Sequence, residues 1–199
     1  MNLLIVRHAE SKGNATGNYS ALDQDSLSDL GQTQAPALAA SLQKMEFDKI
    51  IVSPLQRTLE TLSPYLELTN QHAEIWPEIA EACAHKVREE ASDSWETQTA
   101  ELPDTVASPL FSYRNYYAIK PARIHTFGEA LRRVYDALEL LQELSRANES
   151  VLMLTHGHFI RELINLMLDT PKTIAYPHDN CGMTLMKFDG TWSMDFCNR

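Results

Sequence analysis

Apolar residues in this chain follow two patterns that predict two kinds of element. Short uninterrupted runs are typical of strands buried on both faces of a parallel sheet. They lie at residues 3–6, 50–52 and 151–154. Longer segments repeat a large aliphatic residue every three or four positions, which predicts amphipathic helices. These segments lie at 55–66, 131–144 and 160–167.

The residues that flank these patterns predict where elements begin and end. Ser28 is a good N-cap for a helix running to about residue 45. Pro36 should either kink this helix or move its start to a later residue. Ser53 and Pro54 together predict the start of the next helix. A third strand is expected at 73–76, a loop at 12–24, and a terminal hairpin at 182–188 and 191–196.

Strands that alternate with helices define an α/β fold. We expect a three-layer sandwich, with a mostly parallel central sheet flanked by helices. The 199 residues fit a single domain spanning 1–199. The periodicity weakens at about 83–126, where aromatic residues are too frequent for a solvated linker. We interpret this segment as an inserted lid, with ordinary packing of a long connection as the alternative.

Charge and composition narrow the classes of partner. The formal net charge of -10 argues against a nucleic-acid or anionic-membrane surface. No apolar run approaches the roughly 20 residues of a membrane span. The opening run is too short for a signal peptide, and the three cysteines contain no CxxC pair. We therefore expect a cytoplasmic protein with reduced thiols, and the oligomeric state stays open.

Three predicted strands end in a cationic or imidazole side chain. Arg7 and His8 follow the first, Arg57 lies one helical turn beyond the second, and His156 follows the fourth. The carboxyl ends of parallel strands meet at one edge of a sheet, where ligands bind. Two guanidiniums that converge there suit a doubly charged tetrahedral anion, and helix N-termini would add to the same field. The pattern predicts a phosphoryl site.

A histidine held among such cations keeps a neutral, nucleophilic ring. His8 is the candidate nucleophile, and Arg7, Arg57 and His156 would stabilise charge on the phosphoryl oxygens. A leaving alkoxide also needs a carboxylic acid nearby. His156 and His158 do not have a metal-ligand spacing, and His158 is left out of the predicted site.

Four ordered motifs resemble the histidine phosphatase superfamily, whose members are also called phosphoglycerate mutase-like proteins. The motifs are Arg7-His8-Ala9-Glu10-Ser11 with Asn14, Leu27-Ser28-Asp29-Leu30-Gly31 with Gln34-Ala35, Ser53-Pro54-Leu55-Gln56-Arg57-Thr58-Leu59-Glu60-Thr61, and His156-Gly157. The resemblance covers most of the chain outside residues 83–123.

This resemblance implies a phosphohistidine at His8 and a phosphate pocket formed by Arg7, Arg57 and His156, with Asn14 nearby. It implies no metal and no other cofactor. The proton donor of the family is a glutamate after the third strand. Glu81 in Ile79-Ala80-Glu81 fits that context, and Glu78 is the alternative.

One position departs from the family pattern, because Ala9 stands where a glycine usually follows the nucleophile. A torsion that only glycine adopts would strain or inactivate the site, whereas a requirement for small size would tolerate alanine. We expect tolerance.

The resulting prediction is a metal-independent phosphomonoester phosphatase, a histidine acid-type enzyme, that acts on a small phosphorylated substrate. A phosphoglycerate mutase-type phosphotransferase is one alternative, although the chain is short for that class and its lid lacks the class's substrate pattern. A non-catalytic, phosphate-binding pseudo-phosphatase, suggested by Ala9, is the other.

Overall fold

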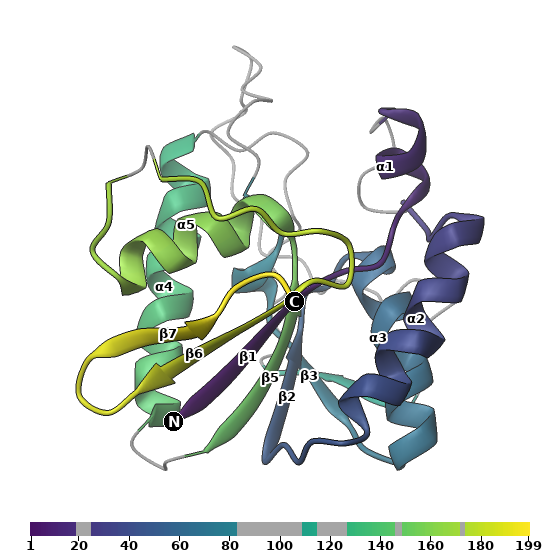
Figure 1. The fold of residues 1–199 in the computed structure, drawn as a ribbon, viewed down its shortest axis with the longest axis horizontal. Helices are drawn as coiled ribbons and strands as arrows, with labels where there is room; N and C mark the ends of the chain where they lie inside the picture. The colour runs from purple at the N-terminus through teal and green to yellow at the C-terminus, as the bar shows by residue number, and fades with distance from the viewer. Residues whose placement is uncertain (19–24, 83–108, 115–126, 146–148, 172–173) are drawn as a thin grey trace.

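The computed structural model describes residues 1–18, 25–82, 109–114, 127–145, 149–171 and 174–199 (Figure 1). Its central feature is a seven-stranded sheet with strand order β4-β3-β2-β5-β1-β6-β7. The strands are β1 (Asn2–Arg7), β2 (Lys49–Val52), β3 (Ala73–Ile75), β4 (Phe111–Tyr113), β5 (Ser150–Thr155), β6 (Met183–Phe188) and β7 (Trp192–Phe196). The first five are mutually parallel, and the predicted terminal hairpin, β6 and β7, adds two antiparallel strands beside β1.

Helices cover both faces of this sheet. They are α1 (Lys12–Thr16), α2 (Asp29–Leu42), α3 (Gln56–Thr69), α4 (Phe127–Ser145) and α5 (Gly157–Met167), with a 3-10 turn η1 at Pro77–Ile79. Figure 1 shows α2 and α3 against one face and α4 and α5 against the other. The predicted three-layer α/β architecture is confirmed.

The first strand shows why its apolar run is uninterrupted. Leu3 and Ile5 pack in the core beneath α4 and α5, whereas Leu4 and Val6 pack in the core beneath α2 and α3. All four side chains are at most 3% exposed. Because successive strand residues point to opposite faces, a strand between two helix layers must be apolar at every position.

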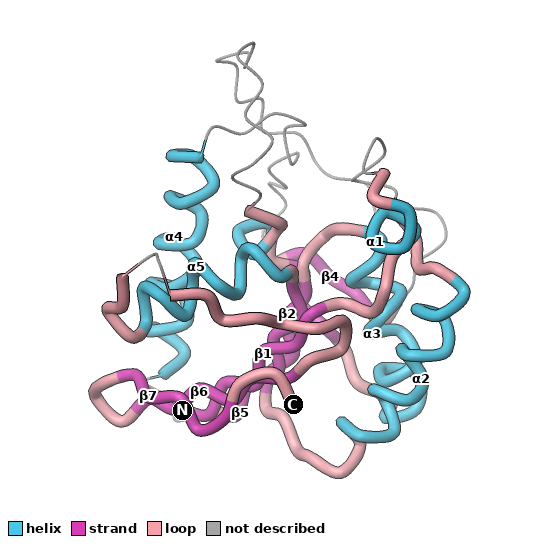
Figure 2. Tube along the Cα trace, turned by 45° about the horizontal axis from the view of Figure 1, so that its top comes forward, coloured by secondary structure: helices cyan, strands magenta, loops and turns pink. Residues whose placement is uncertain are grey.

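The register of the parallel strands brings their carboxyl ends to one level. Arg7 is paired with Thr155, and Val52 with Leu154. The residues that follow β1, β2 and β5 therefore emerge together at the same edge, which Figure 2 turns toward the viewer. This edge is where the sequence predicts the reactive side chains.

The start of α3 differs from the prediction. Ser53 was expected to cap the helix and Pro54 to open it, but the helix begins at Gln56, and its N-cap Leu55 makes no side-chain hydrogen bond. The Ser53 hydroxyl accepts a long hydrogen bond of 3.4 Å from the Leu55 N–H, and it also lies 2.7 Å from the Nε2 atom of His156. A residue that resembles a helix cap therefore also holds a site residue.

The segment after β1 also differs, because Lys12–Thr16 forms a short helix inside the predicted loop. Ser11 and Asn14 form a reciprocal capping box that stabilises this turn. By contrast, Ser28 caps α2 as predicted, and the helix starts at Asp29 despite Pro36 in its interior. Residues 19–24 lie outside the described part of the chain.

The predicted insertion at about 83–126 falls largely outside the described residues, and Cys83 with it. Within it, Phe111–Tyr113 forms β4, which pairs with β3 at the edge of the sheet. Cys181 and Cys197 are free thiols. In the ranges that the structure describes, no helix is long and apolar enough to cross a membrane.

The glycine of the Leu27–Gly31 motif allows α2 to approach the segment that follows the nucleophile. The Ser28 amide donates to the Glu10 carbonyl at 2.9 Å, and the Ser28 hydroxyl donates to the Glu10 carboxylate at 2.7 Å. A Cβ atom at Gly31 would lie 2.0 Å from the Glu10 carbonyl oxygen. Since the obstacle is backbone, a side chain at this position must displace α2 or the site segment.

We expect Gly31→Ala to lower the free energy of unfolding by about 1–3 kcal/mol, the usual cost of overpacking a tight contact. Urea denaturation measures this loss. Gln32→Ala, an exposed position in the same helical turn, serves as the control and should change stability by less than about 0.5 kcal/mol. Equal stability of the two variants would show that the contact with Glu10 is not a constraint.

Candidate active site

His8 is placed directly after β1, and its ring has a defined orientation. The side chain is buried, and its Nδ1 atom lies 2.7 Å from the Ala9 carbonyl oxygen, to which it donates a hydrogen bond. The Nε2 atom therefore carries the lone pair, and it accepts a hydrogen bond of 3.2 Å from the Nε–H of Arg57. One nitrogen is fixed as a donor and the other is available as a nucleophile.

Burial and two arginines keep this ring neutral. Burial lowers the pKa of His8, and the positive charge of Arg57, with a smaller contribution from Arg7, lowers it further, to about 3. A neutral imidazole retains its lone pair throughout the physiological pH range. The sequence-based expectation that cations would suppress protonation of this ring therefore agrees with the geometry, although burial is the larger cause.

His156 lies beside His8, and a serine hydroxyl holds its ring in place. It follows β5, its ring centroid is 5.2 Å from that of His8, and its Nε2 atom is bound to the Ser53 hydroxyl. Burial and the nearby Arg57 hold the pKa of His156 well below its ordinary value. Its buried Nδ1 atom has no hydrogen-bond partner among the described residues. This nitrogen is thus able to bond a group that enters the site.

The two arginines are each anchored by one further group. The Nη1 atom of Arg57, a buried residue, lies 3.8 Å from a carboxylate oxygen of Asp25. Arg7 donates to the carbonyl oxygen of His178 at 2.6 Å. The buried Nε of Arg7 finds no hydrogen-bond acceptor in the described part of the chain. The guanidiniums are thus fixed at the edge of the sheet, where both act on the pKa of His8.

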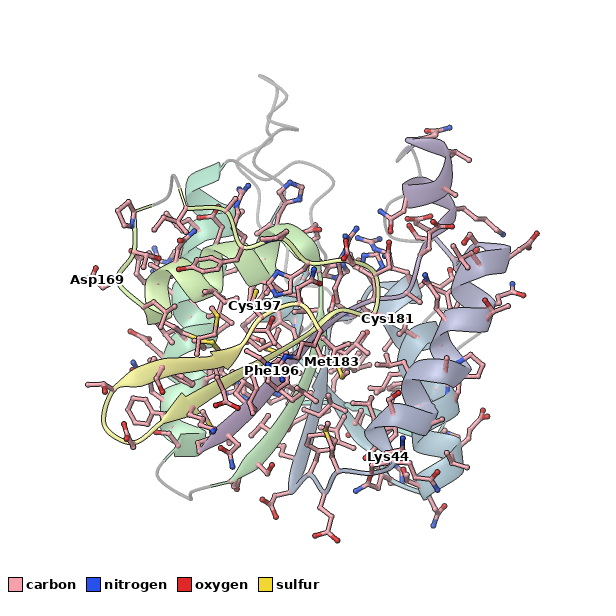
Figure 3. All side chains as sticks on the ribbon, in the orientation of Figure 1. Lys44, Asp169, Cys181, Met183, Phe196 and Cys197 are labelled. Atoms are coloured by element: carbon pink, nitrogen blue, oxygen red, sulfur yellow. The ribbon has the colours of Figure 1, made fainter. Side chains whose placement is uncertain are left out.

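Asn14 is connected to His8 by hydrogen bonds through Asn180, a residue that was not predicted to belong to the site. Its side-chain oxygen accepts a hydrogen bond of 3.1 Å from the Asn180 amide, which also donates to the His8 carbonyl oxygen at 2.9 Å. The next residue, Cys181, whose side chain is labelled in Figure 3, donates its backbone N–H to the carbonyl oxygens of Arg7 and His8. The segment before β6 therefore fixes the backbone that carries the nucleophile.

Ala9 fits its position without strain. It is fully buried, and its backbone N–H donates to the Thr61 hydroxyl at 3.0 Å. It is not one of the residues with a positive φ angle. The position therefore requires a small side chain and does not require the torsions reserved for glycine, as expected.

Glu81 approaches the same site from the segment after η1. Its Oε1 atom accepts hydrogen bonds from the backbone N–H groups of Phe159 and Ala82, at 3.1 and 2.9 Å. Its Oε2 atom lies 3.8 Å from the Nδ1 atom of His158. Burial alone would raise the pKa of Glu81, but His158 and Arg57 outweigh it and lower this pKa to about 2.

Arg133 of α4 holds the backbone around this glutamate. Its guanidinium donates to the carbonyl oxygens of Ala80 and Glu81, at 2.7 and 2.9 Å. Glu78, the alternative proton donor, instead lies 3.7 Å from Arg114, which stacks on the Trp76 ring. Glu81 is among the charges that act on the pKa of His8, so its position suits the predicted role better than that of Glu78.

The structure thus brings all the predicted site residues to one edge of the sheet. They are Arg7, His8, Asn14, Arg57, Glu81 and His156. The contributions of Ser53, Asp25, Asn180 and His158 were missed. Ser53 opens one of the quoted motifs and His158 lies two residues after a site histidine, whereas Asp25 and Asn180 stand in no quoted motif. Among the described residues, no three His, Cys, Asp or Glu side chains gather in a group that could hold a metal ion.

Two histidines and two arginines that gather at the carboxyl edge of a parallel sheet are typical of proteins that handle phosphoryl groups. The chain matches the family model "Histidine phosphatase superfamily (branch 1)" over residues 3–198, and it belongs to that superfamily.

Curated relatives of the chain are phosphatases. It is 24% identical over 176 residues to the adenosylcobalamin/alpha-ribazole phosphatase of Salmonella typhimurium, covering 86% of this chain and 81% of that protein. It is 41% identical over 70 residues to phosphoserine phosphatase 1 of Hydrogenobacter thermophilus. That match covers 35% of this chain and spans only a third of the relative's length.

Solved structures share the fold. The alpha-ribazole phosphatase of Shigella flexneri has a TM-score of 0.72 at 20% identity, covering 100% of this chain and 96% of that one. The phosphoserine phosphatase of Entamoeba histolytica, solved with 3-phosphoglyceric acid, has a TM-score of 0.70 at 17% identity, with the same coverage.

The depressed pKa of His8 predicts a specific loss of stability in acid. Between pH 6.5 and 3 the unfolded chain binds a proton at His8 and the folded protein does not, so stability falls as the pH falls through this window. The expected slope is about 1.4 kcal/mol per pH unit once the unfolded side chain is protonated.

We expect His8→Asn to remove this contribution, so that its free energy of unfolding falls less steeply than that of the wild type between pH 6 and 5. Urea denaturation at several pH values measures both slopes. His72→Asn, an exposed histidine at the amino end of β3, is the control and should keep the wild-type slope. Parallel curves for all three proteins would contradict a buried neutral His8.

Proposed function

We propose that this protein is a metal-independent phosphomonoester phosphatase that forms a phosphohistidine at His8. The observation that carries the proposal is the fixed orientation of the His8 ring. Nδ1–H is bound to the Ala9 carbonyl, so that Nε2 faces Arg57 with its lone pair. This arrangement presents a nucleophile where a phosphoryl group would be bound.

In the first step, Arg7, Arg57, His156 and Asn14 bind the phosphoryl oxygens, and the Nε2 atom of His8 attacks phosphorus. The bond from phosphorus to the leaving oxygen breaks, and that oxygen takes a proton from Glu81. Charge on the equatorial oxygens is stabilised by groups that are already oriented, so little reorganisation is needed. Ser53 and Asp25 support this step by holding His156 and Arg57 in place.

In the second step, water attacks the phosphohistidine and gives a proton to Glu81, and the bonding electrons return to Nε2 of His8. Glu81 is ionised in the unoccupied site, since its pKa is about 2. A bound dianionic phosphoryl group adds negative charge beside this carboxylate and raises its proton affinity. Substrate binding itself would therefore convert Glu81 to the acid that the first step requires.

The proposed substrate is a small phosphorylated metabolite, handled by one domain spanning 1–199 in the cytoplasm. Two kinds of support bear on the substrate class. The relatives are named for phosphoserine and alpha-ribazole phosphates, and the Entamoeba histolytica neighbour was solved with 3-phosphoglyceric acid. The reason to consider a pseudo-phosphatase was Ala9, and the unstrained fit of that residue supports a catalytic protein over this alternative.

The direct test is turnover of p-nitrophenyl phosphate in the presence of a chelator. We expect activity that His8→Ala lowers by at least about a thousandfold, because the nucleophile is lost. His72→Ala, which removes an exposed histidine at the opposite edge of the sheet, should leave kcat unchanged. Activity that requires added metal, or that survives His8→Ala, would overturn the mechanism.

The choice between the two glutamates predicts a leaving-group effect. Glu81→Gln should lower kcat/KM for benzyl phosphate by about a hundredfold or more, because an alkoxide needs a proton, and should affect p-nitrophenyl phosphate far less. Glu78→Gln should stay within about threefold of wild type for both substrates. The opposite result would assign the acid to Glu78.

A further inference from the structure

The proposed function leaves open how Glu81 becomes protonated at the start of each turnover, because the proton that it takes from water in the second step is lost when phosphate leaves and its pKa returns to about 2. This carboxylate is ionised before substrate binds, yet it must carry a proton when the leaving oxygen departs. Its side chain is mostly buried, with 17% of its surface exposed. A neighbouring group that exchanges protons with solvent near neutral pH would supply what the step lacks.

The two oxygens of Glu81 have different surroundings. Oε1 is committed to the backbone, since it accepts the N–H groups of Phe159 and Ala82. Oε2 instead faces the imidazole of His158, with 3.8 Å between Oε2 and Nδ1. The oxygen that is not held by backbone amides is thus the one beside a histidine.

His158 is suited to exchange protons with solvent. It lies in the first turn of α5, two residues after His156, and 32% of its side-chain surface is exposed, nearly twice the fraction of Glu81. Histidine is the side chain that ordinarily changes charge between pH 5 and 8. A shift of about 1 Å would bring Nδ1 and Oε2 to hydrogen-bond distance, and catalytic contacts often tighten when substrate binds.

We propose that His158 is a positioning residue for the proton donor, orienting Oε2 of Glu81 and supplying the proton that Glu81 transfers to the leaving oxygen. The Nδ1–H bond of protonated His158 breaks and its electron pair stays on Nδ1, while an O–H bond forms on Oε2. Neutral His158 then regains a proton from solvent, and Glu81 returns to solvent the proton that it takes from water in the second step, so the cycle balances. The inference rests on the proposed phosphatase function.

Other charges face Glu81 from each element packed against it. Arg57 approaches from α3 and Arg133 from α4, and His8 lies at the end of β1. The carboxylates of Glu78 and Asp136 in turn act on the guanidinium of Arg133 and raise its pKa. Both arginines stay protonated near neutral pH, and the pKa of Arg133 is about 10. Among the described groups that face Glu81, His158 is therefore the exposed one whose side-chain type ordinarily changes charge near neutral pH.

A purely structural ion pair between His158 and Glu81 is the competing account, and leaving-group chemistry separates the two. The quantity to measure is kcat/KM, which covers only the steps up to departure of the leaving group. The substrates are p-nitrophenyl, phenyl and benzyl phosphate, whose leaving groups need a proton to an increasing degree. The proteins are wild type, His158→Ala, Glu81→Gln, the double variant that combines these two changes, and His72→Ala as the matched exposed control.

We expect His158→Ala to lower kcat/KM for benzyl phosphate about 10- to 100-fold, phenyl phosphate less, and p-nitrophenyl phosphate by no more than about twofold. Imidazole added to the buffer should restore part of the lost benzyl phosphate activity. The double variant should be no slower than Glu81→Gln alone, because both substitutions remove the same proton.

An equal loss for all three substrates would show that His158 only supports the fold of the site, and no loss for any of them would show that it has no role. Either result overturns the inference and leaves the phosphatase standing. Wild-type protein that hydrolyses none of the three would instead overturn the proposed function, and the inference with it.

Discussion

The site depends on keeping the imidazole of His8 neutral and in one fixed orientation while two guanidiniums lie beside it. The Ala9 carbonyl holds one nitrogen of His8, the Arg57 guanidinium faces the other, and burial removes the water that would stabilise an imidazolium. Two guanidiniums beside a neutral ring favour an anion as the ligand. A phosphoryl group is such an anion, and it is the group that a neutral histidine can attack.

The fold meets this constraint with short connections from a rigid sheet. Because β1, β2 and β5 end at one level, His8, Ser53 and His156 start from fixed backbone positions. Residues from other parts of the chain then hold the site residues in place. Asp25 contacts Arg57, and the Asn180 amide contacts the carbonyl of His8. Groups anchored in this way lose little entropy when a substrate binds, so binding energy is available for catalysis.

Sequence patterns predicted the layers, the sheet edge and the residues that carry charge there, because burial imposes periodicity and reactive side chains interrupt it. They failed where a residue's role depends on a distant partner. Ser53 has the local chemistry of a helix cap, and only the tertiary structure shows that His156 binds it. Asp25 and Asn180 are single polar residues in loops, where no spacing distinguishes a structural contact from a solvated side chain.

The central claim is a covalent bond from phosphorus to the Nε2 atom of His8, and trapping it is the most direct measurement. The protein would be mixed with excess p-nitrophenyl phosphate, quenched in alkali within milliseconds, and examined by intact mass and peptide mapping. The account predicts a single phosphoryl adduct that is stable in alkali, labile in acid and located on His8. An adduct on another residue, or no adduct during a measured burst of p-nitrophenol, would contradict it.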